Sequence, residues 1–199
     1  MKSISQQIRT IAASDYDLIS LQNEYGKNKH FVHAFELQSL IALSHYPELK
    51  NSRINFRLAD KESMAKTTIT FWSLFFHNKH IVIYINKNPS TTGLAFSDLP
   101  FNAQVGAIAH ELAHAADFKS KNLTGMVWWG VRYTGKTSRI KIERNTDCCT
   151  IQHGMGWQLY DFTNAVTLSP AATTRYKLFK EKYYLSPGEI REQLSTLHD

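Results

Sequence analysis

The stretch that organises this sequence reads Ala109-His110-Glu111-Leu112-Ala113-His114-Ala115 and carries the pattern HExxH. On a helix, positions i and i+4 lie about 40° apart around the axis, so both imidazoles project from one face. Two imidazoles placed in this way can bind one tetrahedral zinc ion. Glu111 lies beside that face, where it can accept a proton from a water molecule at the metal.

The residues around the motif predict a buried helix. Val105, Ile108 and Leu112 supply an apolar side, and Asn102, which follows Pro100, is the predicted N-cap. The alternative is that both histidines are core residues of an ordinary helix in a non-enzymatic binding protein. The zinc content of the purified protein distinguishes the two interpretations.

A second pair of acidic residues follows in the segment Lys141-Ile142-Glu143-Arg144-Asn145-Thr146-Asp147. Glu143 and Asp147 are again at positions i and i+4. If this segment is helical, one carboxylate can complete the metal site, and the other can lie one turn along and orient a ligand histidine.

HExxH followed by ExxxD resembles the gluzincin clan of zinc metallopeptidases, to which thermolysin and the HtpX-like membrane peptidases belong. The likeness covers residues Thr67 to Gly156. It implies that Glu143 is the third zinc ligand and that Asp147 hydrogen-bonds His110. The implied function is a zinc-dependent endopeptidase with Glu111 as general base. The implied fold is zincin-like α+β, with a small antiparallel or mixed sheet, an edge strand above the HExxH helix, and several packing helices.

Three segments predict strands. Arg53 to Leu58 alternates between apolar and polar residues, whereas Thr67–Phe76 and Ile81–Asn86 are rich in β-branched and aromatic residues and predict a hairpin. In gluzincins, an edge strand above the cleft binds extended peptide by strand addition. By resemblance, Thr67–Ser73 is the candidate substrate-binding edge, and the alternative is an ordinary core strand.

The chain of 199 residues is long enough for one core, and we expect a single domain over residues 1–199. Helical extensions are expected at about residues 1–50 and 165–199. Within the first, residues 3–26 predict one or two helices with Ser14 or Asp15 as a cap. Residues 30–46 predict a stronger helix, which Pro47 ends.

The second half of the chain predicts further helices. We expect one long helix from about Ser138 to Asn164, in which Gly154 would allow a close approach to the HExxH helix. The pattern Ser186-Pro187-Gly188-Glu189 is a capping box that opens a last helix to about Leu197. Between the two motifs, the pair Trp128-Trp129 predicts core packing or a pocket wall.

The bulk composition predicts a cytoplasmic protein. Cys148 and Cys149 are adjacent, a spacing that strains a disulfide, so two thiols in a reducing compartment are expected. The N-terminus has no apolar signal region, and no apolar run is long enough to span a membrane. The net charge of +6 predicts a solvated basic surface. Nucleic acid is the alternative acidic partner, although no nucleic-acid motif is present.

His153-Gly154-Met155-Gly156-Trp157 resembles a segment of SprT-like proteases, in which a third histidine binds zinc and which act on DNA–protein crosslinks. On a straight helix His153 would lie about 80° from Glu143, so the two cannot easily serve one metal. Glu143 is preferred because Asp147 supplies the expected partner for a ligand histidine.

Two further points stay open in the sequence. A peptidase also needs a group that stabilises the oxyanion, for which Tyr133, Arg132 and His153 are the candidates. A zinc-binding module without peptidase activity is the other functional alternative. The presence of Glu111 argues against it, since a structural zinc site needs no base.

Overall fold

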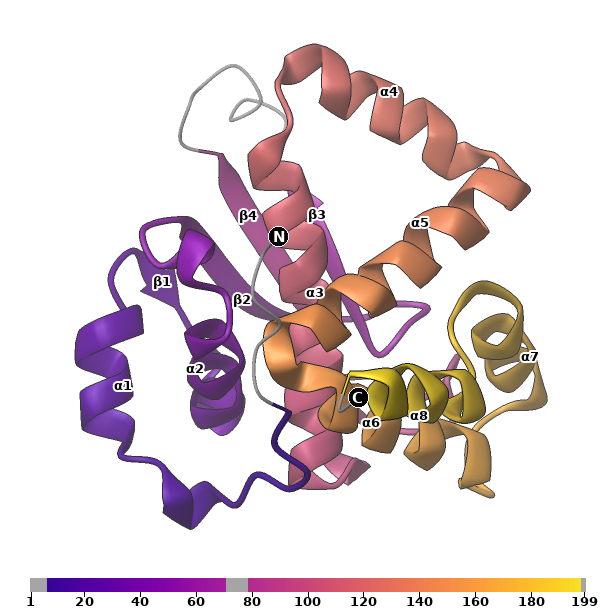
Figure 1. Cartoon of the computed structure of the whole chain (residues 1–199), viewed down its shortest axis with the longest axis horizontal. Coiled ribbons are helices and arrows are strands. Elements are labelled where there is room, and N and C mark those ends of the chain that lie inside the picture. The colour runs from indigo at the N-terminus through magenta and orange to yellow at the C-terminus, as the bar shows by residue number, and fades with distance from the viewer. Residues whose placement is uncertain (1–6, 71–78, 198–199) are drawn as a thin grey trace.

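The computed structural model describes residues 7–70 and 79–197, which form an α+β structure with one small mixed sheet (Figure 1). Its helices are α1 (Leu18–Tyr25), α2 (Glu36–Ser44), α3 (Phe101–Ser120), α4 (Leu123–Thr134), α5 (Lys136–Thr150), α6 (Gly156–Leu168), α7 (Thr174–Tyr183) and α8 (Pro187–Thr196). Short helical turns lie at Ala13–Asp15, His33–Phe35, Pro47–Leu49 and Phe96–Asp98. Figure 1 shows α3 through the middle of the molecule, with α1 and α2 on one side and α6 to α8 on the other.

The sheet contains β1 (Lys29–His30), β2 (Arg53–Ala59), β3 (Ala65–Ile69) and β4 (His80–Asn86) in the order β1-β2-β4-β3. The first three strands of this order run parallel, and β3 pairs antiparallel with β4. The strand expected from Arg53 and the hairpin are therefore confirmed, and the sheet is mixed. Residues 71–76 of the predicted hairpin lie outside the described residues.

β3 lies at the edge of the sheet that the described residues form, as expected for this segment. Two hydrogen bonds fix its pairing with β4, from Asn86 N to Met64 O and from Thr70 N to His80 O. Because facing residues of an antiparallel pair alternate between bonded and non-bonded, the N–H and C=O groups of Ala65, Thr67 and Ile69 point away from β4. Three residues therefore present backbone donors and acceptors along the edge.

α3 is the central element of the core, and it is buried along most of its length from Asn102 to Ala115. The prediction that Asn102 caps this helix is wrong, because the helix begins at Phe101 and its N-cap is Pro100. The Asn102 amide is buried within the fold, where its Oδ1 accepts hydrogen bonds from Ile11 N and Gln158 Nε2, both at 3.1 Å.

Residues 138–164 do not form one continuous helix, so the prediction of a single helix from Ser138 to Asn164 is wrong. A π-helical turn at Ile151–Met155 separates α5 from α6, and Gly154 lies there at φ 83°. A glycine tolerates this left-handed conformation, which other residues rarely adopt. α3 and α6 approach each other closely at Gly106 of α3, where a Cβ atom would lie 2.0 Å from Gln158 O.

The N-terminal helices are also shorter than the sequence predicted. α1 begins after Asp17, whose carboxylate accepts from Ile19 N and Ser20 N and replaces the expected caps. The helix expected at residues 30–46 is β1 followed by a helical turn and α2.

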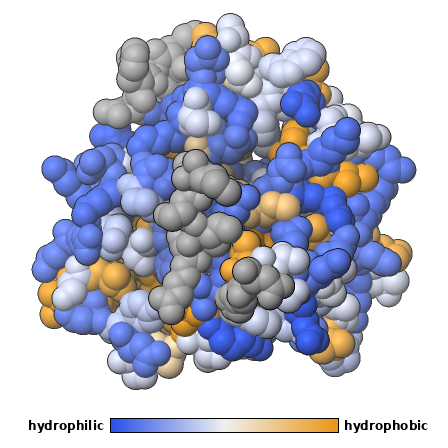
Figure 2. Space-filling view, in the orientation of Figure 1, coloured by the Kyte–Doolittle hydropathy of each residue, from blue (hydrophilic) through white to orange (hydrophobic). Residues whose placement is uncertain are grey.

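The surface view is largely hydrophilic with small hydrophobic patches (Figure 2). Trp128 on α4 is 64% exposed, so this residue does not pack in the core. Cys148 and Cys149 remain thiols, as expected. Within the described ranges, no helix has the length and apolar character needed to cross a membrane.

Candidate metal centre

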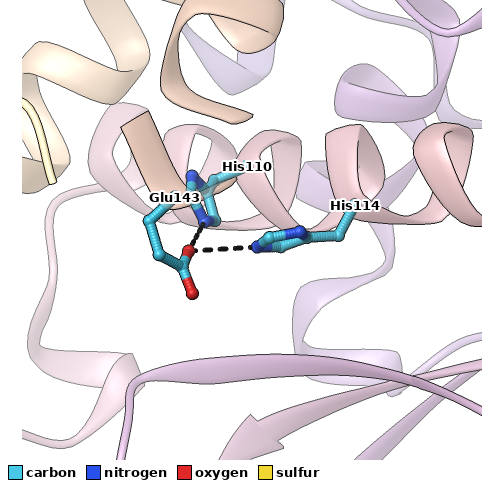
Figure 3. A group of neighbouring side chains, drawn as sticks. All are labelled: His110, His114 and Glu143. Atoms are coloured by element: carbon cyan, nitrogen blue, oxygen red, sulfur yellow. Dashed lines mark hydrogen bonds and ion pairs between the residues drawn. The ribbon is translucent and has the colours of Figure 1, made fainter. Parts of the chain in front are cut away.

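Three buried side chains meet where α3 and α5 cross. His110 and His114 come from α3 and Glu143 comes from α5 (Figure 3). Glu143 Oε2 lies 3.4 Å from His110 Nε2 and 3.2 Å from His114 Nε2. One potential ligand atom from each residue lies within 4.8 Å of the others, so this group could hold a metal ion.

The orientation of both imidazoles is fixed by acceptors behind them. His110 Nδ1 donates to Asp147 Oδ1 at 2.8 Å. Thr146 Oγ1 donates to Ile142 O at 2.9 Å, so its lone pair faces His114 Nδ1 at 3.3 Å. With the proton of each ring held on Nδ1, both Nε2 atoms direct a lone pair toward Glu143.

A cation suits the point at which these atoms converge. His110 Nε2 is buried and makes no hydrogen bond with any residue that the structure describes. With both rings neutral and protonated on Nδ1, two imidazole lone pairs and one oxygen of the buried Glu143 carboxylate would face one another as acceptors. The donor set of two nitrogens and one oxygen fits a divalent metal of the zinc type.

The electrostatics of the group also favour a positive charge. Burial lowers the pKa of His110, but its contacts with Asp147 and Glu143 outweigh burial and raise this pKa to about 10. Burial raises the pKa of Glu143, but His110 and His114 hold that pKa well below its usual range. The carboxylate is therefore ionised, and a cation beside it, either a proton or a metal ion, is stabilised.

Asp147 is held in place by the C-terminal part of the chain. Its Oδ2 atom accepts a hydrogen bond from Leu185 N at 2.8 Å, while Oδ1 faces His110. Next to it, Arg144 is paired with Glu189 of α8. The segment between α7 and α8 therefore fixes the carboxylate that orients His110.

Glu111 lies next to the three-residue group but outside it. Its Oε2 atom accepts a hydrogen bond from Thr67 Oγ1 at 2.7 Å, and the same hydroxyl lies 2.9 Å from Glu111 O. Its other carboxylate oxygen makes no hydrogen bond with the described residues. This edge strand thus positions a buried carboxylate beside the two histidines.

The site opens into a cleft with a volume of about 780 Å³. His114, Glu111 and Glu143 lie in its wall together with β3, α4 and α7. Tyr133 of α4 also lines the cleft, and its Oη atom donates to Glu143 Oε1 at 2.5 Å. Burial first, and then the Glu143 carboxylate, raise the pKa of Tyr133 above its ordinary value, so the hydroxyl stays protonated.

The other two oxyanion candidates lie elsewhere. Arg132 lines a second cleft and is absent from the wall of the metal cleft. His153 is placed by the π-helical turn, where its Nδ1 donates to Cys149 O at 2.8 Å and its Nε2 lies 3.0 Å from Glu48 Oε1. The ring stacks on Tyr46 at 4.3 Å between centroids. The structure therefore brings Glu143 to the two histidines, whereas His153 lies outside this group and does not line the metal cleft.

Three contacts at the site were not found from the sequence. These are the Thr67 hydroxyl on Glu111, the Leu185 amide on Asp147, and Thr146 behind His114. Of these residues, only Thr146 could have been found from the sequence, because it lies three residues after Glu143 and therefore on the same face of the helix. The other two join segments far apart in the chain.

No family model, no curated protein and no solved structure matches this chain. The chemistry of the buried group and of its cleft is therefore the basis for assigning a function.

Proposed function

We propose that this chain is a zinc-dependent endopeptidase with a zincin-like, gluzincin-type site. The observation that carries the proposal is the position of Glu111. It is a buried carboxylate beside the metal-binding group but outside it, held by a threonine of the cleft-edge strand. A site that only held a metal would have no use for such a base.

Zinc is the metal that we assign to His110, His114 and Glu143. Its preferred ligands include imidazole nitrogen and carboxylate oxygen, and a catalytic zinc site has three protein ligands. When bound there, zinc supplies Lewis acidity that polarises a substrate carbonyl and acidifies water. His114 and Glu143 line the cleft, so a metal held by these residues would be open to a substrate in the cleft.

Glu111 acts as the proton carrier in this proposal. The carboxylate removes a proton from the attacking water as the new C–O bond forms at the scissile carbonyl. When the C–N bond breaks, Glu111 returns that proton to the leaving amine nitrogen. The hydrogen bond from Thr67 to Oε2 leaves the second oxygen of the carboxylate to carry the proton.

The substrate that fits the edge strand is an extended polypeptide. The outward N–H and C=O groups of Ala65, Thr67 and Ile69 can each pair with backbone groups of a chain added beside β3. Thr67 joins the two functions, since its backbone faces the edge and its side chain holds Glu111. An added strand would therefore run past the proposed base.

Tyr133 is the side chain that we assign to the oxyanion. It is a protonated donor in the cleft wall, and its hydroxyl already lies 2.5 Å from Glu143 Oε1. A substrate carbonyl oxygen that gains negative charge would compete with Glu143 for this hydroxyl.

Replacement of Glu111 by glutamine tests the proposal. Glu111→Gln keeps the shape of the side chain and removes the base, so we expect stoichiometric zinc and a loss of cleavage by about three orders of magnitude or more. Unstructured protein and long peptides are the substrates, and phenanthroline should abolish the wild-type activity until zinc is restored. Equal cleavage by wild type and Glu111→Gln would refute the proposal. Stoichiometric zinc without cleavage of any substrate would instead identify a metal-binding module.

A further inference from the structure

Arg139 is a cation in the wall of the metal cleft whose guanidinium donates no hydrogen bond to the residues that the structure describes. It lies one helical turn before Glu143 on α5, and its Nε atom is 4.0 Å from Glu143 Oε1. That distance is too long for a hydrogen bond. The Nε atom is buried, and the guanidinium makes no hydrogen bond with any residue in the described ranges.

Aromatic rings hold this guanidinium in place. Its Cζ atom lies 4.8 Å from the ring centre of Tyr133, 5.2 Å from that of Phe179 and 4.8 Å from that of Tyr183. These rings come from α4 and α7, on two sides of α5. These cation–π contacts involve the charge of the guanidinium and form no hydrogen bond, so its N–H groups remain available to a ligand.

The N–H groups of Arg139 can therefore donate to an acceptor on a bound ligand. The side chain of Arg139 is 31% exposed, and the residue lines the cleft, so a ligand in the cleft can reach it. A planar guanidinium fixed between rings is matched by a planar anion that accepts two parallel N–H bonds, which is the geometry of a carboxylate. A backbone carbonyl offers only one acceptor atom and no charge.

We infer that Arg139 binds a carboxylate of the peptide substrate in this cleft, either the C-terminal carboxylate or an acidic side chain. This inference rests on the proposed peptidase function and adds a substrate class to it. The carboxylate occupies the part of the cleft between α4, α5 and α7. Arg139 is thus a residue that determines specificity, whereas Glu111 carries the proton.

Binding of matched peptides to zinc-loaded Glu111→Gln protein tests the inference without turnover. Three N-acetylated peptides are built on one sequence of neutral residues. The first has a free C-terminal carboxylate and the second has a C-terminal amide. The third has the C-terminal amide and one neutral residue replaced by glutamate. Calorimetry should show that one or both carboxylate peptides bind about 10- to 100-fold more tightly than the neutral amide, since charge-assisted pairs are worth that much. Which of the two gains affinity identifies the source of the carboxylate.

Substitutions of Arg139 locate the effect. Arg139→Gln should remove the preference for the carboxylate peptides, and Arg139→Lys should retain part of it because the charge remains. Arg175→Gln is the matched control, since Arg175 is another cation in the wall of the same cleft, and this variant should retain the preference. Zinc content and circular dichroism of each variant verify that the site and the fold persist.

The outcomes separate this inference from the proposed function. Equal affinity for all three peptides, an equal loss for all three in Arg139→Gln, or loss of the preference in Arg175→Gln would overturn the assignment to Arg139. If wild type nevertheless cleaves peptides, the peptidase proposal stands without it. If the protein cleaves no peptide but still prefers the carboxylate peptides in a way that depends on Arg139, the carboxylate site is supported and only the peptidase proposal is refuted.

Discussion

The hydroxyl of Thr67 lies 2.7 Å from Oε2 of Glu111 and joins the edge strand to the carboxylate that follows His110 on α3. The contact links residues 44 positions apart in the sequence, and both partners are buried. Because α3 is fixed in the core, this bond sets the direction of the Glu111 side chain from the side of the edge strand. A strand added to the edge would therefore be aligned with the base by the same residue.

Thr67→Val tests this coupling. Valine keeps the shape of threonine but removes the donor, and loss of a hydrogen bond to a charged group costs about 1.5–3 kcal/mol. We expect kcat to fall roughly 10-fold or more, because Glu111 loses its fixed orientation, while zinc remains stoichiometric. Steady-state kinetics and metal analysis of the same preparation measure both quantities.

Thr68→Val is the matched control on the same strand. Its hydroxyl is 3.4 Å from Val82 O and makes no contact with Glu111. The control should retain wild-type kcat. An equal loss in both variants would show that the strand, and not the Thr67 hydroxyl, is responsible.

Asp147 should control metal affinity without binding the metal. Asp147→Asn removes the charge that faces His110 Nδ1 while one oxygen can still accept from Leu185 N. We expect the zinc dissociation constant to rise by about 10- to 100-fold, as is usual when the partner of a ligand histidine is lost. Competition with a chromophoric chelator measures it.

The control for this prediction is Asp117→Asn on α3. Asp117 is a partly exposed carboxylate paired with Lys121, away from the three ligands. Its replacement should leave zinc affinity unchanged. Wild-type affinity in Asp147→Asn would show that His110 needs no acceptor behind it.

Local patterns predicted the parts of the site that lie on single helices. HExxH and ExxxD each place two side chains on one helical face, and periodicity needs only the helix to be correct. The pairing of β3 with β4 followed from β-branched and aromatic runs in the same way, whereas the parallel pairs β1–β2 and β2–β4 were not predicted. These patterns led to His110, His114, Glu143 and Asp147, which the structure brings together.

The sequence-based predictions failed where tertiary packing overrides the local sequence pattern. Gly154 interrupts the predicted long helix with a left-handed residue, and that break turns His153 toward Glu48. Asn102 has the residue type of a cap but is used as a buried amide. The contact of Thr67 with Glu111 could not be predicted, because no periodicity relates a strand to a helix 44 residues away.

The ion pair between Glu189 and Arg144 should make stability depend on acid pH. The hydrogen bond from Arg144 is the main cause that lowers the pKa of Glu189 to about 2, below its unfolded value of about 4.3. A carboxyl with a depressed folded pKa contributes stability that is present above the unfolded pKa and is lost as pH falls through the folded one. We expect Glu189→Gln to lower Tm at pH 7 and to approach the wild-type Tm near pH 2.

Glu192→Gln removes the same charge from the same helix at an exposed position and serves as the control. Both series are measured with a chelator present, so that metal loss in acid does not contribute. A constant difference in Tm between wild type and Glu189→Gln from pH 7 to pH 2 would contradict the prediction.

Tyr133→Phe tests the assignment of the oxyanion donor. The substitution removes the hydroxyl that lies 2.5 Å from Glu143 Oε1 and keeps the ring that stacks on Arg139. We expect kcat to fall about 100-fold or more, as when one oxyanion donor is removed, with KM changed much less and zinc still stoichiometric. Tyr183→Phe removes a hydroxyl from another ring on Arg139 and should retain kcat. If Tyr133→Phe instead loses zinc and keeps the kcat of its zinc-loaded fraction, the hydroxyl supports Glu143 as a ligand and does not stabilise the oxyanion.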